Sequence, residues 1–334
     1  MKTPPYLLTL LFLLLAIVLS VAVGSVFIPL TDLWRVLTGR PAEVVAQAAT
    51  IILTLRLPRT ILVLLTGAAL GGSGAAYQGV FRNPLADPYL IGVASGAGLG
   101  AVLAMSVRWP YTPLGLLAVP VAAFAGAVVT VFVVYMLARV GRAVPTTNLI
   151  LAGVAVGAFA SALTSFLMLR STDELHRAVA WLLGGAIVAG WGPVLTVLPY
   201  LAAGLGVLFL GGHALNLLQF GDEQAAQMGL AVTRARTVIL LAASLTTAAA
   251  VAFSGIIGFI GLILPHVMRL WFGPDYRRLL PLAAIGGAGA LLVADVLARV
   301  VLRPQELPVG VVTAIAGAPF FLWILRRAKN QGYW

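Results

Sequence analysis

Long apolar runs separated by short polar connections make up most of the chain. A helix needs about 20 largely apolar residues to cross the hydrocarbon core of a bilayer. Backbone groups in hydrocarbon must pair within their own segment, so these runs predict helices, whereas a β-barrel would alternate over about ten residues. The ten predicted spans are residues 6–29, 60–81, 89–107, 113–138, 147–169, 190–211, 235–253, 255–271, 279–301 and 309–325.

The first apolar run follows Lys2 and extends from Tyr6 to about Leu30. A secretory signal has an apolar region of about 7–15 residues, which is shorter than this run. We therefore expect an uncleaved first span. The Lys and Arg residues of the connections slightly favour a cytoplasmic N-terminus. This orientation places several arginines outside, and topology alone does not explain them. Arg56 and Arg59 are among them.

Composition agrees with a membrane protein. Of the 334 residues, 61% are hydrophobic and only 9% are charged, with a mean hydropathy of +1.05. Soluble domains are nearer a quarter charged. The net charge of +11 comes from basic residues scattered between apolar runs, without the basic face that nucleic acid requires. There is no Cys, and the three His residues are far apart, so we expect no metal site.

Glycine is abundant inside the predicted spans. Several of the 36 glycines have GxxxG spacing, for example Gly67 and Gly71, which predicts close packing between helices. Polar or glycine-rich breaks follow the second span at residues 83–88 and the seventh at residues 254–266. These breaks are five spans apart, so the two halves would face opposite ways, as in transporters built from inverted repeats.

The sequence contains few residues or motifs that could support catalysis or ion coupling. It has no phosphate-binding loop and no H-E-x-x-H motif, and its only lysines are Lys2 and Lys329. Ion-driven carriers usually bury carboxylates or His in the membrane. Here only Asp295 lies clearly within a span, and Arg299 follows one helical turn later as a neutralising partner. We therefore expect no enzyme, no bound cofactor and no ion relay, so transport would draw its energy from a partner.

The longest polar connection on the cytoplasmic side of this predicted topology covers residues 212–234. Asp222 after Gly221 is predicted to cap a short helix that runs to Met228, and Gly229 is predicted to end it. A short amphipathic helix between spans is suited to docking a partner. The alternative is an interfacial loop that lies on the lipid headgroups.

Four stretches of the sequence resemble the FecCD-type permeases of bacterial ABC importers, which handle iron–siderophores, haem and vitamin B12. They follow one another in the family's order over essentially the whole chain. The stretches are Arg56–Thr60; Gly67–Gln78 with Arg82–Gly92; Leu151–Ala155 with Trp181–Gly185; and Gly255–Gly273, Asp275–Arg278, Ala294–Arg299, Glu306–Gly310 and Gly317–Phe320.

The resemblance implies an all-α, polytopic membrane protein with type II ABC importer permease architecture and about ten helices per subunit. Residues 1–334 would form one transmembrane permease domain in the bacterial inner membrane. The implied partners are a second copy around a central path, two cytoplasmic ATPase subunits that hold ATP and Mg, an extracytoplasmic binding protein and membrane lipid. The implied cargo is a ferric siderophore or haem, moved by alternating access, and a corrinoid stays open as the alternative.

The resemblance also assigns roles to particular residues. It places Arg56, Arg59 and Arg299 at the outer face, where they would dock glutamates of the binding protein; plain interfacial anchoring is the alternative. It matches the 213–230 loop to the segment that inserts into the ATPase. The coupling residues are then Leu218, Phe220, Asp222, Glu223, Ala226, Met228 and Gly229, together with Arg277 and Arg278.

Two further assignments concern the path through the membrane. Thr146 and Thr147 resemble the cytoplasmic gate where two subunits meet, although they would also suit the N-cap of the fifth span. Small or polar members of otherwise apolar helices are candidates for lining the path: Gly71, Ser73, Gln78 and Ser161.

Two other classes of protein compete with this interpretation. An ion-driven secondary carrier is disfavoured by the scarcity of carboxylates within the spans. A membrane scaffold without transport activity is disfavoured by the ordered polar breaks.

Overall fold

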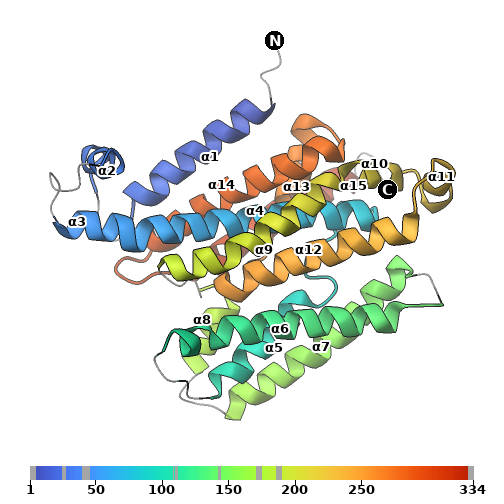
Figure 1. The fold of residues 1–334 in the computed structure, drawn as a ribbon, viewed down its shortest axis with the longest axis horizontal. Helices are drawn as coiled ribbons and strands as arrows, with labels where there is room; N and C mark the ends of the chain where they lie inside the picture. The colour runs from blue at the N-terminus through green and yellow to red at the C-terminus, as the bar shows by residue number, and fades with distance from the viewer. Residues whose placement is uncertain are drawn as a thin grey trace.

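The computed structural model describes residues 5–24, 28–39, 46–107, 109, 112–141, 144–170, 175–185 and 190–329, and these are predominantly helical (Figure 1). The helices, in chain order, are α1 (Pro5–Ala22), α2 (Leu30–Leu37), α3 (Ala46–Thr50), the π-helix η2 (Ile51–Arg56), α4 (Leu57–Phe81), α5 (Val93–Met105), α6 (Pro113–Ala138), α7 (Thr146–Arg170), α8 (Leu175–Leu182), α9 (Trp191–Leu210), α10 (Gly212–Leu218), α11 (Asp222–Gln227), α12 (Val232–Ser254), α13 (Ile260–Phe272), α14 (Tyr276–Val300) and α15 (Val309–Lys329).

Each of the ten predicted spans overlaps a helix, with boundaries shifted by up to seven residues. The largest shift is at the first span, which was predicted to end at residue 29, whereas α1 ends at Ala22. Among the described residues, seven helices are long and apolar enough to cross a membrane. The other three predicted spans correspond to shorter apolar helices, at Val93–Met105, Ile260–Phe272 and Val309–Ile324. A helix of 13 residues, such as α5 or α13, extends only about 20 Å. The bundle therefore combines full spans with half-length helices.

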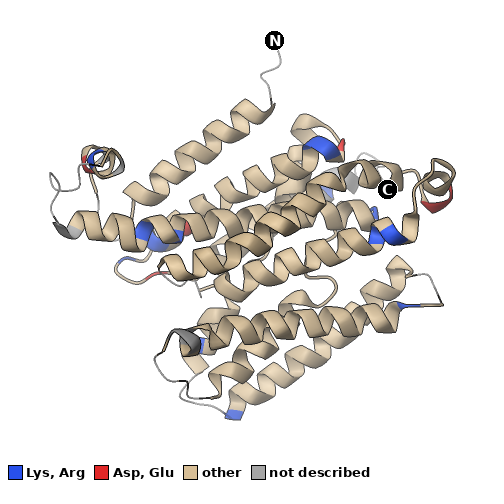
Figure 2. Ribbon diagram, in the orientation of Figure 1, with Lys and Arg blue, Asp and Glu red and all other residues tan. Residues whose placement is uncertain are grey.

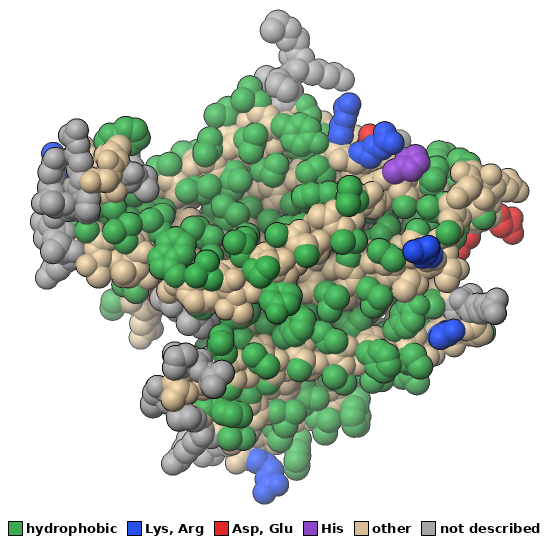
Figure 3. All heavy atoms as spheres, viewed as in Figure 1, with side chains coloured by type: hydrophobic (Ala, Val, Ile, Leu, Met, Phe, Trp, Pro, Cys, Tyr) green, Lys and Arg blue, Asp and Glu red, His purple; other side chains and the backbone are tan. Residues whose placement is uncertain are grey.

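The long helices run roughly parallel or antiparallel to one another, so the bundle has two ends (Figure 1). We call them the α2 end and the α11 end after the short helices that lie there. In the view of Figure 3, hydrophobic side chains cover the face over α9, α12 and α6. The basic and acidic residues lie mainly toward the ends of the helices (Figure 2). This distribution is that of a protein whose middle contacts hydrocarbon.

The central helix is α4. It packs along α14 and also contacts α12, α13 and α9, so its residues from Gly71 to Val80 are all buried. Small residues permit this enclosure. A Cβ atom at Gly71 would collide with the carbonyl oxygen of Ala283 in α14, and one at Gly74 with the carbonyl oxygen of Gly261 in α13. The predicted packing role of the GxxxG spacing is confirmed at this helix pair.

Two breaks in the helices meet inside the protein. Residues 82–92 separate α4 from α5, and residues 255–259 separate α12 from α13. The hydroxyl of Tyr89 donates to the carbonyl oxygen of Ile257 (2.9 Å) and accepts from the Ile257 amide (3.2 Å). Irregular backbone is tolerated at membrane depth only where protein surrounds it or water reaches it, and Ile257 is 1% exposed.

The break at residues 255–259 also corrects the predicted start of the eighth span. We expected that span to begin at residue 255, but α13 begins at Ile260. The preceding residue, Phe259, has a φ of 69°, which is incompatible with a continuous right-handed helix. The inverted relation between the two halves remains a prediction.

Substitution of Gly71 tests the close packing of α4 on α14. Within a helix, alanine is normally more favourable than glycine by about 1 kcal/mol. At Gly71 we expect Gly71→Ala to lower the thermal unfolding midpoint in detergent, because the new methyl group meets backbone that cannot rotate away. Gly206→Ala in α9 is the matched control, since nothing lies within 4 Å of its Cβ position. Equal shifts for both variants would contradict the packing described here.

Candidate functional site

At the α2 end, a buried carboxylate holds two arginines. Arg59, in the first turn of α4, donates from Nε and Nη2 to Oδ1 of Asp295 in α14 (3.1 and 2.9 Å). Arg299 places its Nε 3.0 Å from Oδ2 of the same carboxylate, which confirms the expected i,i+4 pair. Arg59 also donates from Nη1 to Oε2 of Glu306 (2.8 Å). Asp295 is fully buried, so these contacts neutralise a charge that water does not reach.

Two arginines at this end, Arg56 and the same Arg299, bind the C-terminus of α1. Arg56 donates to the carbonyl oxygens of Val21 and Ala22 (2.7 and 2.9 Å). Arg299 donates to those of Val23 and Ser20 (3.0 and 3.1 Å). The last carbonyls of a helix lack partners within the helix and carry partial negative charge, which cations stabilise.

This arrangement differs from the expectation of three exposed docking arginines. Arg56 and Arg299 are 6% and 4% exposed, whereas the Arg59 side chain is 20% exposed. An arginine at the end of a span can point outward or back onto a neighbouring helix, and the sequence does not distinguish the two. Only Arg59 keeps a route to a partner in this conformation. Together, Arg56, Arg59, Arg299, Asp295 and Glu306 carry one positive charge in excess.

At the α11 end, α10 and α11 form a projection that we call the knob, residues 212–229 (Figure 1). Its base is fixed by polar contacts. The Asn216 side chain donates to Oδ1 of Asp275 (2.6 Å) and accepts from the Tyr276 amide (2.8 Å). Gln219 donates to the carbonyl oxygen of Gly79 in α4 (3.0 Å). Hydrogen bonds from the Asn216 side chain and the Arg277 amide lower the pKa of Asp275 below its ordinary value.

The tip of the knob presents apolar side chains to solvent. Phe220 is 62% exposed and Met228 is 49% exposed, although each is large and hydrophobic. Asp222, Glu223, Ala226 and Gly229 are also exposed, as are Arg277 and Arg278 beside the knob. Leu218 is an exception among the predicted coupling residues, because it is 1% exposed and belongs to the base.

The helix predicted after Gly221 is present, with a different cap. Gly221 occupies the N-cap position of α11, and Asp222 is the first helical residue. The Asp222 carboxylate accepts from Arg236 in α12 (2.6 Å) instead of capping the helix. Gly229 follows the helix with a φ of 89°, a conformation that favours glycine, as predicted.

The candidates for lining the path divide into two groups. Gly71, Ser73 and Gln78 are buried within this one chain, which corrects their assignment to an open path. Gln78, for example, donates to the carbonyl oxygen of Leu262 (3.0 Å) and accepts from Arg269 (2.9 Å). Small and polar residues on a central helix serve packing and internal hydrogen bonds as readily as they line a path. Ser161 is exposed on α7 and remains a prediction.

The gate residues lie at the first turn of α7, where Thr146 is half-buried and Thr147 is exposed. Their role also remains a prediction. Sequence reasoning missed three residues that organise the structure: Asn216 at the knob, Tyr89 at the breaks and Glu306 beside Arg59. Tyr89 and Glu306 stand inside the motifs that carry the family resemblance, so the signal was present. Asn216 carried no such signal.

Long apolar helices, two helix breaks that meet inside the bundle and a solvent-exposed knob define a multi-pass membrane protein of the transporter type. Residues 12–327 match the FecCD transport family, and the chain belongs to it.

Similar proteins have permease functions. The chain is 45% identical over 279 residues to the cobalamin import system permease protein BtuC of Halobacterium salinarum, covering 84% of this chain and 74% of that one. It is 42% identical over 285 residues to the hemin transport system permease protein HmuU of Yersinia pestis, covering 84% of each. A solved structure of an inward-facing metal-chelate type ABC transporter matches 96% of this chain and 98% of its own, with 29% identity and a TM-score of 0.81.

Neutralising Asp295 tests the buried ionic cluster. Asp295→Asn leaves Arg59 and Arg299 facing each other without the shared carboxylate. Removing one partner from a buried ion pair costs about 3–5 kcal/mol, so we expect a large drop in the thermal unfolding midpoint. Asp32→Asn is the control, because Asp32 and Arg35 form a partly exposed pair at 3.5 Å, and such pairs contribute about 0–1 kcal/mol. If Asp295→Asn lowered the thermal unfolding midpoint no more than Asp32→Asn does, the cluster would not stabilise the fold.

Proposed function

We propose that this chain is the permease subunit of an ABC importer that moves a large metal complex across the cytoplasmic membrane by alternating access. The cargo we propose is a ferric siderophore or haem, and a corrinoid is the alternative. Relatives named for hemin and for cobalamin support both. The observation that carries the proposal is the knob: an exposed, partly apolar projection whose base is bonded to the central helix of a FecCD family member.

The knob provides a contact surface for a partner that binds ATP. The sequence has no phosphate-binding loop, so the energy has to enter from outside. We propose that two copies of this chain work with two ATPase subunits, which hold ATP and Mg, and that Phe220 and Met228 insert into them. This partnership places the knob and the N-terminus on the cytoplasmic side. Residues 1–334 then act as one permease domain, with Thr146, Thr147 and Ser161 of α7 facing the second copy.

The opposite end would receive the binding protein. Arg59 reaches the surface there, and the local excess of positive charge favours carboxylates on the partner. Charges at the rim of an interface mainly steer and orient the encounter. In this proposal a carboxylate of the binding protein competes with Glu306 for Arg59. The permease needs two packings that are close in energy, which the two kinds of partner bias in turn.

Reconstitution tests the proposed function. In vesicles containing this chain with its ATPase and a loaded binding protein, we expect uptake of haem or ferric siderophore that requires ATP and withstands an uncoupler. Without the ATPase we expect no uptake. Accumulation that is independent of the ATPase and collapses with the uncoupler would instead establish an ion-driven carrier. Cobalamin supplied in parallel distinguishes the two cargo classes.

The same vesicles test whether stimulation of the ATPase depends specifically on the knob. Phe220→Glu with Met228→Glu should abolish stimulation of the ATPase, because it places two charges in an apolar contact. Val140→Glu, an exposed apolar residue beyond the end of α6, is the matched control and should leave stimulation intact.

The proposed competition between Glu306 and the binding protein for Arg59 gives a further prediction. Glu306→Gln removes the carboxylate that accepts from Nη1 of Arg59. We expect the binding protein to associate up to about fivefold faster at low ionic strength, with the gain lost at high salt. Stopped-flow or surface-based association measurements provide the rate. Glu223→Gln at the α11 end is the control. An association rate unchanged by Glu306→Gln would remove Arg59 from the docking surface.

A further inference from the structure

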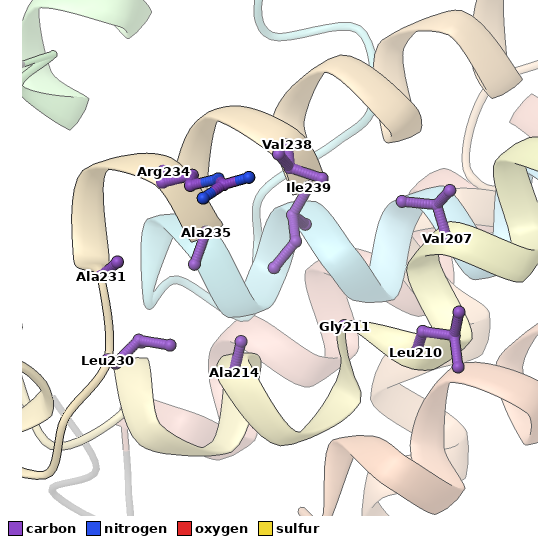
Figure 4. Close-up of a pocket in the computed structure, with 10 residues that line it drawn as sticks. All are labelled: Val207, Leu210, Gly211, Ala214, Leu230, Ala231, Arg234, Ala235, Val238 and Ile239. Atoms are coloured by element: carbon purple, nitrogen blue, oxygen red, sulfur yellow. The ribbon is translucent and has the colours of Figure 1, made fainter.

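An apolar groove lies between α9, α10 and α12, beside the base of the knob (Figure 4). Its volume is about 360 Å³. Figure 4 shows the Ala214 and Ala235 side chains pointing into it from opposite walls, on α10 and α12. Small residues hollow the surface here between larger aliphatic side chains. The lining residues are Val207, Leu210, Gly211, Ala214, Leu230, Ala231, Arg234, Ala235, Val238 and Ile239.

The groove opens between two helices, α9 and α12, that are long and apolar enough to cross a membrane. Each contributes an exposed apolar side chain to the groove: Leu210 of α9 is 87% exposed and Val238 of α12 is 47% exposed. Leu210 is the last residue of α9, and Arg234 lies in the first turn of α12. The groove is therefore at the level where the spans end and lipid headgroups begin.

One charged residue stands at the groove. Arg234 is exposed, and within the described part of the chain its guanidinium has neither a hydrogen bond nor an ion pair. The nearby Arg236 differs, because Asp222 neutralises it at 2.6 Å. Figure 4 shows the Arg234 side chain lying along α12 toward Val238. The first turn of α12 adds positive potential, since no side chain caps it.

We propose that this groove binds an anionic phospholipid, with the phosphate beside Arg234 and one acyl chain between α9, α10 and α12. The apolar walls select a hydrocarbon chain, because each buried methylene favours binding. The unpaired guanidinium selects a negative headgroup. Since α10 forms one wall, the bound lipid braces the base of the knob against the spans.

Photolabelling in vesicles tests the site. The full-length protein is reconstituted in phosphatidylcholine that contains a trace of phosphatidylglycerol with a photoactivatable group in its acyl chain, and labelled peptides are mapped. We expect labelling within residues 207–214 and 230–239. Arg234→Gln should reduce it about fivefold, the weight of one basic residue at an anionic surface. Arg139→Gln, an exposed arginine beyond the end of α6, is the charge-matched control.

A steric variant and a second probe complete the test. Ala235→Phe fills the groove while keeping Arg234, so it should abolish labelling there, and its unfolding midpoint shows whether the protein is still folded. The second probe is phosphatidylcholine with the same photoactivatable group. The proposal would be overturned if this probe labelled the groove as strongly as the anionic probe, or if Arg234→Gln were labelled as strongly as the unmodified protein. It would also be overturned if cross-linking showed that a second copy of the chain covers the groove.

Discussion

The structure depends on one constraint: in lipid, every backbone polar group has to find its partner within the protein. The chain meets it with long helices at the periphery and a buried helix, α4, at the centre. Because neighbouring helices enclose α4, the chain can leave helical geometry beside it without exposing amides to hydrocarbon. The contact between Tyr89 and Ile257 joins the two irregular segments and satisfies both polar groups of Ile257.

The same helix pair connects the two ends of the bundle. Helix α4 begins near Arg59, in the ionic cluster, and ends near Gly79, which accepts a hydrogen bond from the knob. Helix α14 runs the other way, from Asp275 at the knob to Asp295 in the cluster. At the glycines of this contact the two helix backbones approach so closely that neither helix has room for a Cβ atom. Two closely packed helices therefore connect the knob with the ionic cluster at the opposite end.

The sequence predicted the fold more completely than the site. Hydrophobic run length located a helix in each of the ten predicted spans, because burial in lipid leaves a pattern in each segment independently. The failures concern which way a side chain points. Arg56 and Arg299 were predicted to dock a binding protein at the outer face, but both turn back onto α1. Gly71, Ser73 and Gln78 resembled a polar path, but α4 is surrounded by its own chain. These outcomes depend on tertiary neighbours, which no local pattern records.

The central claim is that the knob, α4 and α14 move as one rigid unit when partners act on it. Spin labels test it directly, because the chain has no cysteine that would react elsewhere. Labels at Gln224→Cys on α11 and Val301→Cys after α14, in protomers diluted with unlabelled protein, give the distance between the two ends. We predict the same distance with and without ATP bound to the ATPase partner. A change of about 5 Å, one helical turn, would contradict the claim.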